Sequence, residues 1–132
     1  MQRTHVPTTR QHGLTMTGFL FVAILLAAAA LVAMKLVPAY IEFFSIKKIF
    51  NTMSQDASLA NKTNAEIRSD FEKRASVDYV TVVKPEQLVI NRRGGTPVIS
   101  VDYEYRTKLI GNISLVADFS ASTDPGRAAQ IE

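Results

Sequence analysis

The stretch LTMTGFLFVAILLAAAALVAM, residues 14–34, decides how this chain is arranged. It holds 21 residues without a charged side chain. As an α-helix it would extend roughly 31 Å, close to the ~30 Å thickness of the hydrocarbon core of a bilayer. We therefore expect a transmembrane helix over residues 14–37, preceded by a polar N-terminal arm over residues 1–13. A cleaved signal peptide is the main alternative, but the apolar run continues past its alanines, which favours a retained span.

Small residues within the span recur at four-residue spacing, as Ala23 with Ala27 and Ala29 with Ala33. This spacing lets a second helix approach closely in a membrane. The four alanines are therefore candidate contacts with another transmembrane subunit. The alternative is that alanine only fills an apolar helix.

The sequence after the span predicts that the same helix continues out of the membrane. Lys35 can extend its ammonium group to the lipid headgroups. Pro38 lacks an N–H group and should bend the helix. Apolar residues then recur at helical spacing, which predicts an amphipathic continuation whose stripe includes Ile46, Phe50 and Met53.

Residues 38–120 are expected to form a small α+β domain outside the membrane. Thr63 and Glu66 fit a capping box that opens a short second helix, ending near Ala75. Alternating β-branched and aromatic residues then predict a four-stranded antiparallel meander, with strands at residues 79–83, 88–92, 98–108 and 113–120. A polar tail follows at residues 121–132.

The register of the meander can be predicted, because a one-residue slip would turn every side chain to the other face. A two-residue turn at Gly94-Gly95 places Ile90 opposite Ile99. In the last hairpin, a three-residue loop at 110–112, with Asn112 in the left-handed conformation, places apolar residues opposite each other. The resulting apolar face carries Val101, Tyr103 and Phe119, and it should receive the helix stripe.

Composition argues against several classes of function. The net charge is +3, and the 15 Lys and Arg residues are scattered rather than clustered, unlike those of a nucleic-acid-binding face. The chain has no Cys, which excludes disulfides and thiolate metal sites. His5 and His12 are the only histidines, seven residues apart with no carboxylate near them, so solvated side chains are favoured over metal ligands.

No arrangement in the sequence indicates catalysis, a cofactor or a small-molecule substrate. Asp102, Glu104 and Asp118 alternate along strands, where solvated carboxylates belong. Arg92 and Arg93 precede the Gly94-Gly95 turn and are interpreted as the tip of a hairpin, although contact with phospholipid or an acidic partner is an alternative.

Two resemblances add to these predictions. Gly13-Leu14-Thr15-Met16-Thr17, with Arg10 before it, resembles the leader junction of type IV pilins and pseudopilins, although Gly18 stands where that family has glutamate. Over nearly the whole chain, the closer resemblance is to a family of uncharacterised single-span proteobacterial membrane proteins, classed as a domain of unknown function. That resemblance is carried by Gly13-Leu14-Thr15, by residues 35–42 (KLVPAYIE), and by Tyr105 with residues 109–113 (LIGNI).

The second resemblance implies a single span, a small folded domain and the bacterial inner membrane, with no activity attached. We expect a non-enzymatic accessory or assembly subunit of a larger membrane complex. Its amino terminus should lie in the cytoplasm and its domain in the periplasm. Membrane lipid and other transmembrane subunits are the expected partners. A minor pilin-like or secretion-apparatus component is the alternative.

Overall fold

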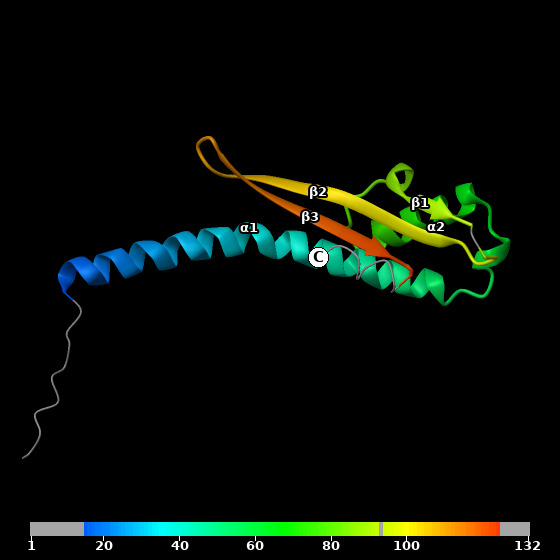
Figure 1. Cartoon of the computed structure of the whole chain (residues 1–132), viewed down its shortest axis with the longest axis horizontal. Coiled ribbons are helices and arrows are strands. Elements are labelled where there is room, and N and C mark those ends of the chain that lie inside the picture. Colours follow the sequence, from blue (N-terminus) through cyan, green and yellow to red (C-terminus); the bar gives the residue numbers. More distant parts are fainter. Residues whose placement is uncertain (1–14, 93, 125–132) are drawn as a thin grey trace, which may run out of the picture.

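The computed structural model describes residues 15–92 and 94–124 and shows an α+β fold. The predicted arm at residues 1–13 and the tail beyond residue 124 lie outside the described residues. Figure 1 shows α1 as a long rod, with the sheet lying along its carboxy-terminal part and its amino-terminal part standing clear of the domain. The elements are α1 (Met16–Ser54), η1 (Leu59–Asn61), α2 (Asn64–Val77), η2 (Pro85–Gln87), β1 (Val89–Asn91), β2 (Val98–Ile110) and β3 (Ile113–Ser122).

α1 is one helix that contains both the apolar segment and the core helix of the domain. Thr15 caps its start, where its hydroxyl accepts a hydrogen bond from the Gly18 N–H at 3.2 Å. The helix passes through Pro38 without a break, and it curves gently in Figure 1. Within the part of the chain that the structure describes, α1 alone is long and apolar enough to cross a membrane. No described residue covers its most apolar stretch.

The sheet is antiparallel in the order β1-β2-β3, and its register is the predicted one. Ile90 pairs with Ile99 across the first hairpin, and Tyr103 pairs with Phe119 across the second. Residue 93, in the first turn, lies outside the described residues. The predicted register therefore holds over both ladders, because it follows from matching the apolar faces.

The turn of the second hairpin differs from the predicted three-residue loop. The register shifts between Lys108 and Ile110, so that Ile110 pairs with Ile113 and only two residues form the turn. The extra residue is taken up by this β-bulge. Gly111, with φ +57°, adopts the left-handed conformation in place of Asn112. Glycine reaches that conformation without steric cost, which explains the choice.

The sheet has three strands, and the prediction of a fourth at residues 79–83 is wrong. Tyr79 has φ +54° and turns the chain directly after α2, where the Val80 N–H donates to the Ala75 carbonyl oxygen at 2.9 Å. The next two backbone N–H groups, of Thr81 and Val82, donate to the Glu42 carboxylate. These donors are therefore not available to a strand ladder, although their residues have high strand propensity.

α1, α2 and the sheet enclose one hydrophobic core. The Thr63–Glu66 capping box that opens α2 is present as predicted. Phe71 of α2 lies 5.9 Å from Phe50 of α1, measured between ring centroids. The loop between the two helices is held by Lys62, whose ammonium group donates to the carboxylates of Asp56 at 2.7 Å and Asp70 at 2.6 Å. These contacts lower the pKa of Asp56 and raise that of Lys62.

Candidate functional site

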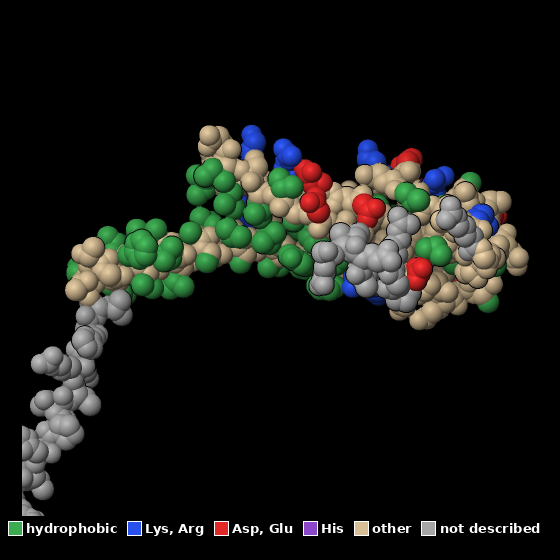
Figure 2. Space-filling model, viewed as in Figure 1, with side chains coloured by type: hydrophobic (Ala, Val, Ile, Leu, Met, Phe, Trp, Pro, Cys, Tyr) green, Lys and Arg blue, Asp and Glu red, His purple; other side chains and the backbone are tan. Residues whose placement is uncertain are grey.

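The candidate site is the surface of the domain next to the apolar part of α1, and its first component is the outward face of α1. Val37, Ile41 and Phe44 are 53%, 60% and 61% exposed. At about 100° per residue they lie on the side of the helix opposite Ile46 and Phe50, which are buried against the domain. Figure 2 shows hydrophobic side chains covering the amino-terminal part of α1 and continuing along it toward the domain. Apolar exposure of this extent is typical of interaction surfaces.

The second component is Glu42, which lies in α1 about two turns after Lys35. It forms hydrogen bonds with the chain segment that follows α2. Its Oε2 atom accepts hydrogen bonds from the Thr81 N–H at 2.8 Å and the Val82 N–H at 3.2 Å. The Thr81 hydroxyl also donates to this carboxylate, at 3.3 Å and 3.4 Å from its two oxygens. One carboxylate thus satisfies two backbone donors that belong to no helix or strand.

The third component is an aromatic cluster around Phe119 of β3. Its ring centroid lies 5.0 Å from Phe43, 5.3 Å from Tyr40 and 5.4 Å from Tyr103. The Tyr103 hydroxyl is buried and makes no hydrogen bond to any described residue. Burial, together with the negative charge of Glu42, raises the pKa of Tyr103 to about 12. The hydroxyl is therefore neutral at neutral pH, and a pKa so far above 7 does not suit proton transfer there.

The structure separates the predicted packing residues into two groups. The four alanines of the span are all exposed along α1, and no described residue packs over them; they are Ala23, Ala27, Ala29 and Ala33. The residues predicted to join helix and sheet all lie within the single buried core; they are Ile46, Phe50, Met53, Val101, Tyr103 and Phe119.

The charged residues considered as catalytic or ligand-binding groups lie elsewhere. Asp102, Glu104 and Asp118 are exposed on the outer face of the sheet. Arg92 donates to the Asn64 side-chain oxygen at 2.8 Å and to the Lys62 carbonyl oxygen, so it holds the start of α2. Over residues 15–92 and 94–124, no three His, Asp or Glu side chains gather where a metal ion could be held. His5, His12 and Arg93 lie outside the described residues.

Sequence reasoning missed the structural role of Glu42. The available signal was its isolation, because Glu42 is the one charged residue between Lys35 and Lys47. A lone carboxylate in an apolar helical segment usually needs a hydrogen-bond donor close to it, because burying an unpaired charge is unfavourable. Its partners lie 39 and 40 residues later in the chain, so spacing along the sequence did not identify them.

Comparison with known families gives one match, to a domain of unknown function, DUF4845, over residues 35–119. The match begins at Lys35, after the apolar segment, and covers α2, both 3-10 turns, β1, β2 and most of β3. No curated protein and no solved structure matches the chain. The matched region exceeds half of the 132 residues, so the chain belongs to the DUF4845 family.

Proposed function

We propose that this protein is a non-enzymatic accessory subunit of a larger membrane complex. In this proposal α1 crosses the bacterial inner membrane once, with the amino terminus in the cytoplasm and the domain in the periplasm. The outward face of α1 binds another transmembrane subunit. That face carries the proposal, because Val37, Ile41 and Phe44 stay exposed although the domain has a complete core beside them.

Two small residues of the span, Ala23 and Ala33, lie on the same side of α1 as this exposed face. Ala23 precedes Ile41 by about five helical turns, and Ala33 precedes Phe44 by about three. Small residues allow close approach of a second helix within lipid. Large apolar residues then offer that helix contact area beyond the hydrocarbon core. A partner helix running alongside α1 would cover both parts.

The connection between span and domain also favours a positioning role. α1 passes from the apolar segment into the core as one helix, with no flexible linker between them. Glu42 fixes the chain after α2 to this helix close to Lys35. The domain is therefore held at a defined height and rotation relative to the span. Such a subunit can place a partner at a fixed distance from the membrane.

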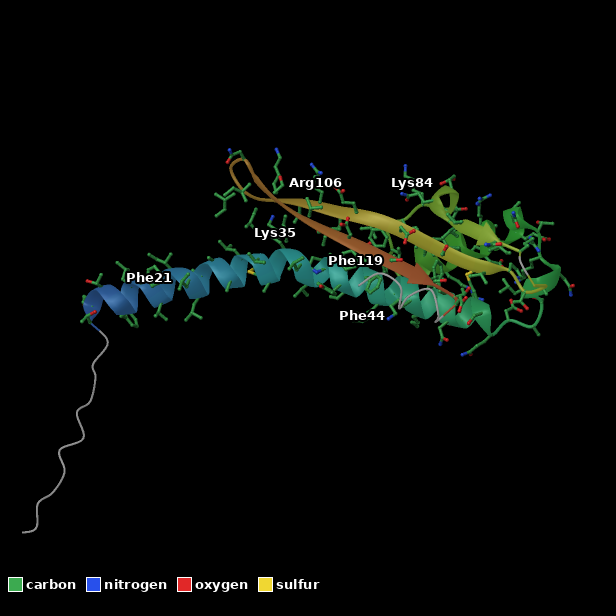
Figure 3. The ribbon with its side chains drawn as sticks, viewed as in Figure 1. Phe21, Lys35, Phe44, Lys84, Arg106 and Phe119 are labelled. Carbon is green, nitrogen blue, oxygen red and sulfur yellow. The ribbon has the colours of Figure 1, made fainter. Side chains whose placement is uncertain are left out.

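Solubilisation of the tagged full chain from its native membrane in mild detergent tests the proposal. We expect a discrete, stoichiometric complex with another membrane protein, which Ile41→Glu with Phe44→Glu disrupts. Lys84→Glu is the matched control and should leave the complex intact, because Lys84 is exposed and lies on the opposite side of the molecule from Phe44 (Figure 3). Recovery of the chain only as a monomer, or a complex that survives the double substitution, would contradict the proposal.

A minor pilin-like or secretion-apparatus component is the second candidate. It is favoured by the combination of one long amino-terminal helix with an antiparallel sheet packed on its second half. Sequencing of the amino terminus of the native protein separates the two. Cleavage after Gly13 supports the pilin-like candidate, whereas an intact Met1 or Gln2 supports the accessory subunit.

A further inference from the structure

We propose that the tip of the β2–β3 hairpin, residues 109–113, is a second membrane contact that rests in the headgroup region beside α1. This inference rests on the proposed function, because it requires α1 to cross the bilayer. It assigns lipid, rather than a protein, as the partner of a surface that neither the core nor the outward face of α1 explains.

The composition of the tip fits lipid. Ile110 and Ile113 pair with each other at the end of the ladder and are 63% and 60% exposed. Exposed large aliphatic side chains at a hairpin end are unfavourable in water. Lys108 and Arg106 precede the tip and are exposed. Cations that flank an apolar tip can reach lipid phosphates while the aliphatic groups enter the acyl boundary.

The position of the tip fits the same surface. β2 and β3 extend well beyond β1, which pairs only with Val98, Ile99 and Ser100 of β2. Figure 1 shows the hairpin running back along α1 toward the amino-terminal end of that helix. In Figure 3 the hairpin end lies at least as far toward that end as Lys35, the residue that closes the uncharged segment. A span ending near Lys35 therefore brings the tip to the level of the headgroups.

Backbone chemistry limits how deep the tip can go. Beyond Ser100, the described part of β2 pairs only with β3, so each strand keeps one edge whose N–H and C=O groups lack ladder partners. Such edges are not tolerated in hydrocarbon, where water cannot satisfy them. The two isoleucines enter the acyl boundary while the edges remain in the hydrated headgroup layer. The contact is shallow, and it fixes the tilt of the domain against the membrane.

Depth-dependent fluorescence quenching tests this, because the chain has no Cys and a single one can be introduced and labelled. The full chain is reconstituted in vesicles of phosphatidylcholine and phosphatidylglycerol without other proteins. Three variants carry the same fluorophore: Ile110→Cys at the tip, Leu25→Cys at the centre of the apolar segment, and Thr96→Cys, exposed at the opposite end of β2. Thr96→Cys also controls for attraction of the label itself to lipid.

We expect Ile110→Cys to be quenched several-fold more by a quencher near the headgroups than Thr96→Cys is, and Leu25→Cys to respond most to a quencher deep in the acyl chains. The inference would be overturned, with the anchor intact, by one pattern of quenching. In that pattern the label at Leu25→Cys is quenched, but the label at Ile110→Cys is quenched no more than the label at Thr96→Cys. Failure of all three positions to respond would overturn both the inference and the span. A label at Ile110→Cys that is as open to aqueous iodide as the label at Thr96→Cys would also overturn it.

Discussion

Glu42 shows how a single side chain can determine the path of a distant segment. Its carboxylate provides the acceptor for two adjacent backbone N–H groups, at Thr81 and Val82. Hydrogen bonds to a charged acceptor are stronger than neutral ones. The interaction directs an apolar segment of high strand propensity away from the sheet and onto α1. The position of the segment after α2 on α1 thus depends on one carboxylate.

Glu42→Gln should therefore lower the free energy of unfolding by about 1–2 kcal/mol, because the neutral amide is a weaker acceptor of the same shape. Hydrogen exchange at the Thr81 and Val82 amides should accelerate more than exchange in α2. Glu72→Gln, on the exposed side of α2, is the matched control. Unchanged exchange at both amides would show that the carboxylate does not hold this segment.

Tyr103→Phe is expected to stabilise the domain by about 1 kcal/mol, because a buried hydroxyl without a described partner is removed. The pH dependence should change as well. The pKa of Tyr103 is raised to about 12 in the folded protein, above the ordinary value near 10. Because burial disfavours the ionised form, the stability of the fold does not vary with pH through this group below pH 10, and it falls as the pH rises from 10 to 12.

The variant should lack that part of the alkaline loss. Chemical denaturation of the full chain in mild detergent, at intervals from pH 8 to about pH 12, measures the difference between the two proteins. Parallel stability curves for Tyr103→Phe and the unaltered chain would contradict the expected linkage.

At the scale of elements, α1 has two apolar faces that differ in burial, as Phe50 and Phe44 show. Phe50 is 1% exposed and packs near Phe71 in the core, whereas Phe44 is 61% exposed on the outward face. Figure 3 shows Phe44 on the side of α1 away from the sheet and Phe119 on β3 facing the helix. Phe50→Ala should cost about 3–5 kcal/mol of domain stability.

Phe44→Ala should change the stability by less than about 0.5 kcal/mol, as expected of a surface position. Thermal unfolding of the full chain in detergent, followed by circular dichroism of the sheet, compares the two. Equal losses for both substitutions would mean that Phe44 belongs to the core and not to a partner surface.

The elements show where prediction from sequence works. Both helices follow from periodicity and capping chemistry, and the β2–β3 register follows from pairing Tyr103 with Phe119. The segment after α2 was mistaken for a strand because its propensity is overruled by a tertiary contact with Glu42. The level of the hairpin tip relative to Lys35 is likewise a three-dimensional property. No periodicity in the sequence encodes it.

At the scale of the whole molecule, α1 continues directly from its apolar segment into the core. A membrane-inserted α1 would therefore move together with the domain. A load or displacement on the domain is transmitted to the span through a hydrogen-bonded helix instead of a loop. The outward face of α1 and the proposed hairpin contact would then act together. In this proposal the outward face contacts the partner, and the hairpin contact fixes the tilt of the domain.

Orientation is the last property that this arrangement leads us to predict, with the amino terminus in the cytoplasm and the domain in the periplasm. Charge near the span does not decide it, because Arg3, Arg10 and the α-amino group before it are balanced by Lys35, Lys47 and Lys48 after it. The length of the domain permits this orientation, because a segment of about ninety residues is translocated largely regardless of its own charges. The resemblance of the Gly13 junction to that of pilins, which insert with the leader inside, favours it. A reporter enzyme that is active only in the periplasm, fused after Glu132, should therefore be active. The matched fusion to a reporter that works only in the cytoplasm should be silent. The reverse pattern would place the domain in the cytoplasm and require a cytoplasmic partner for the outward face of α1.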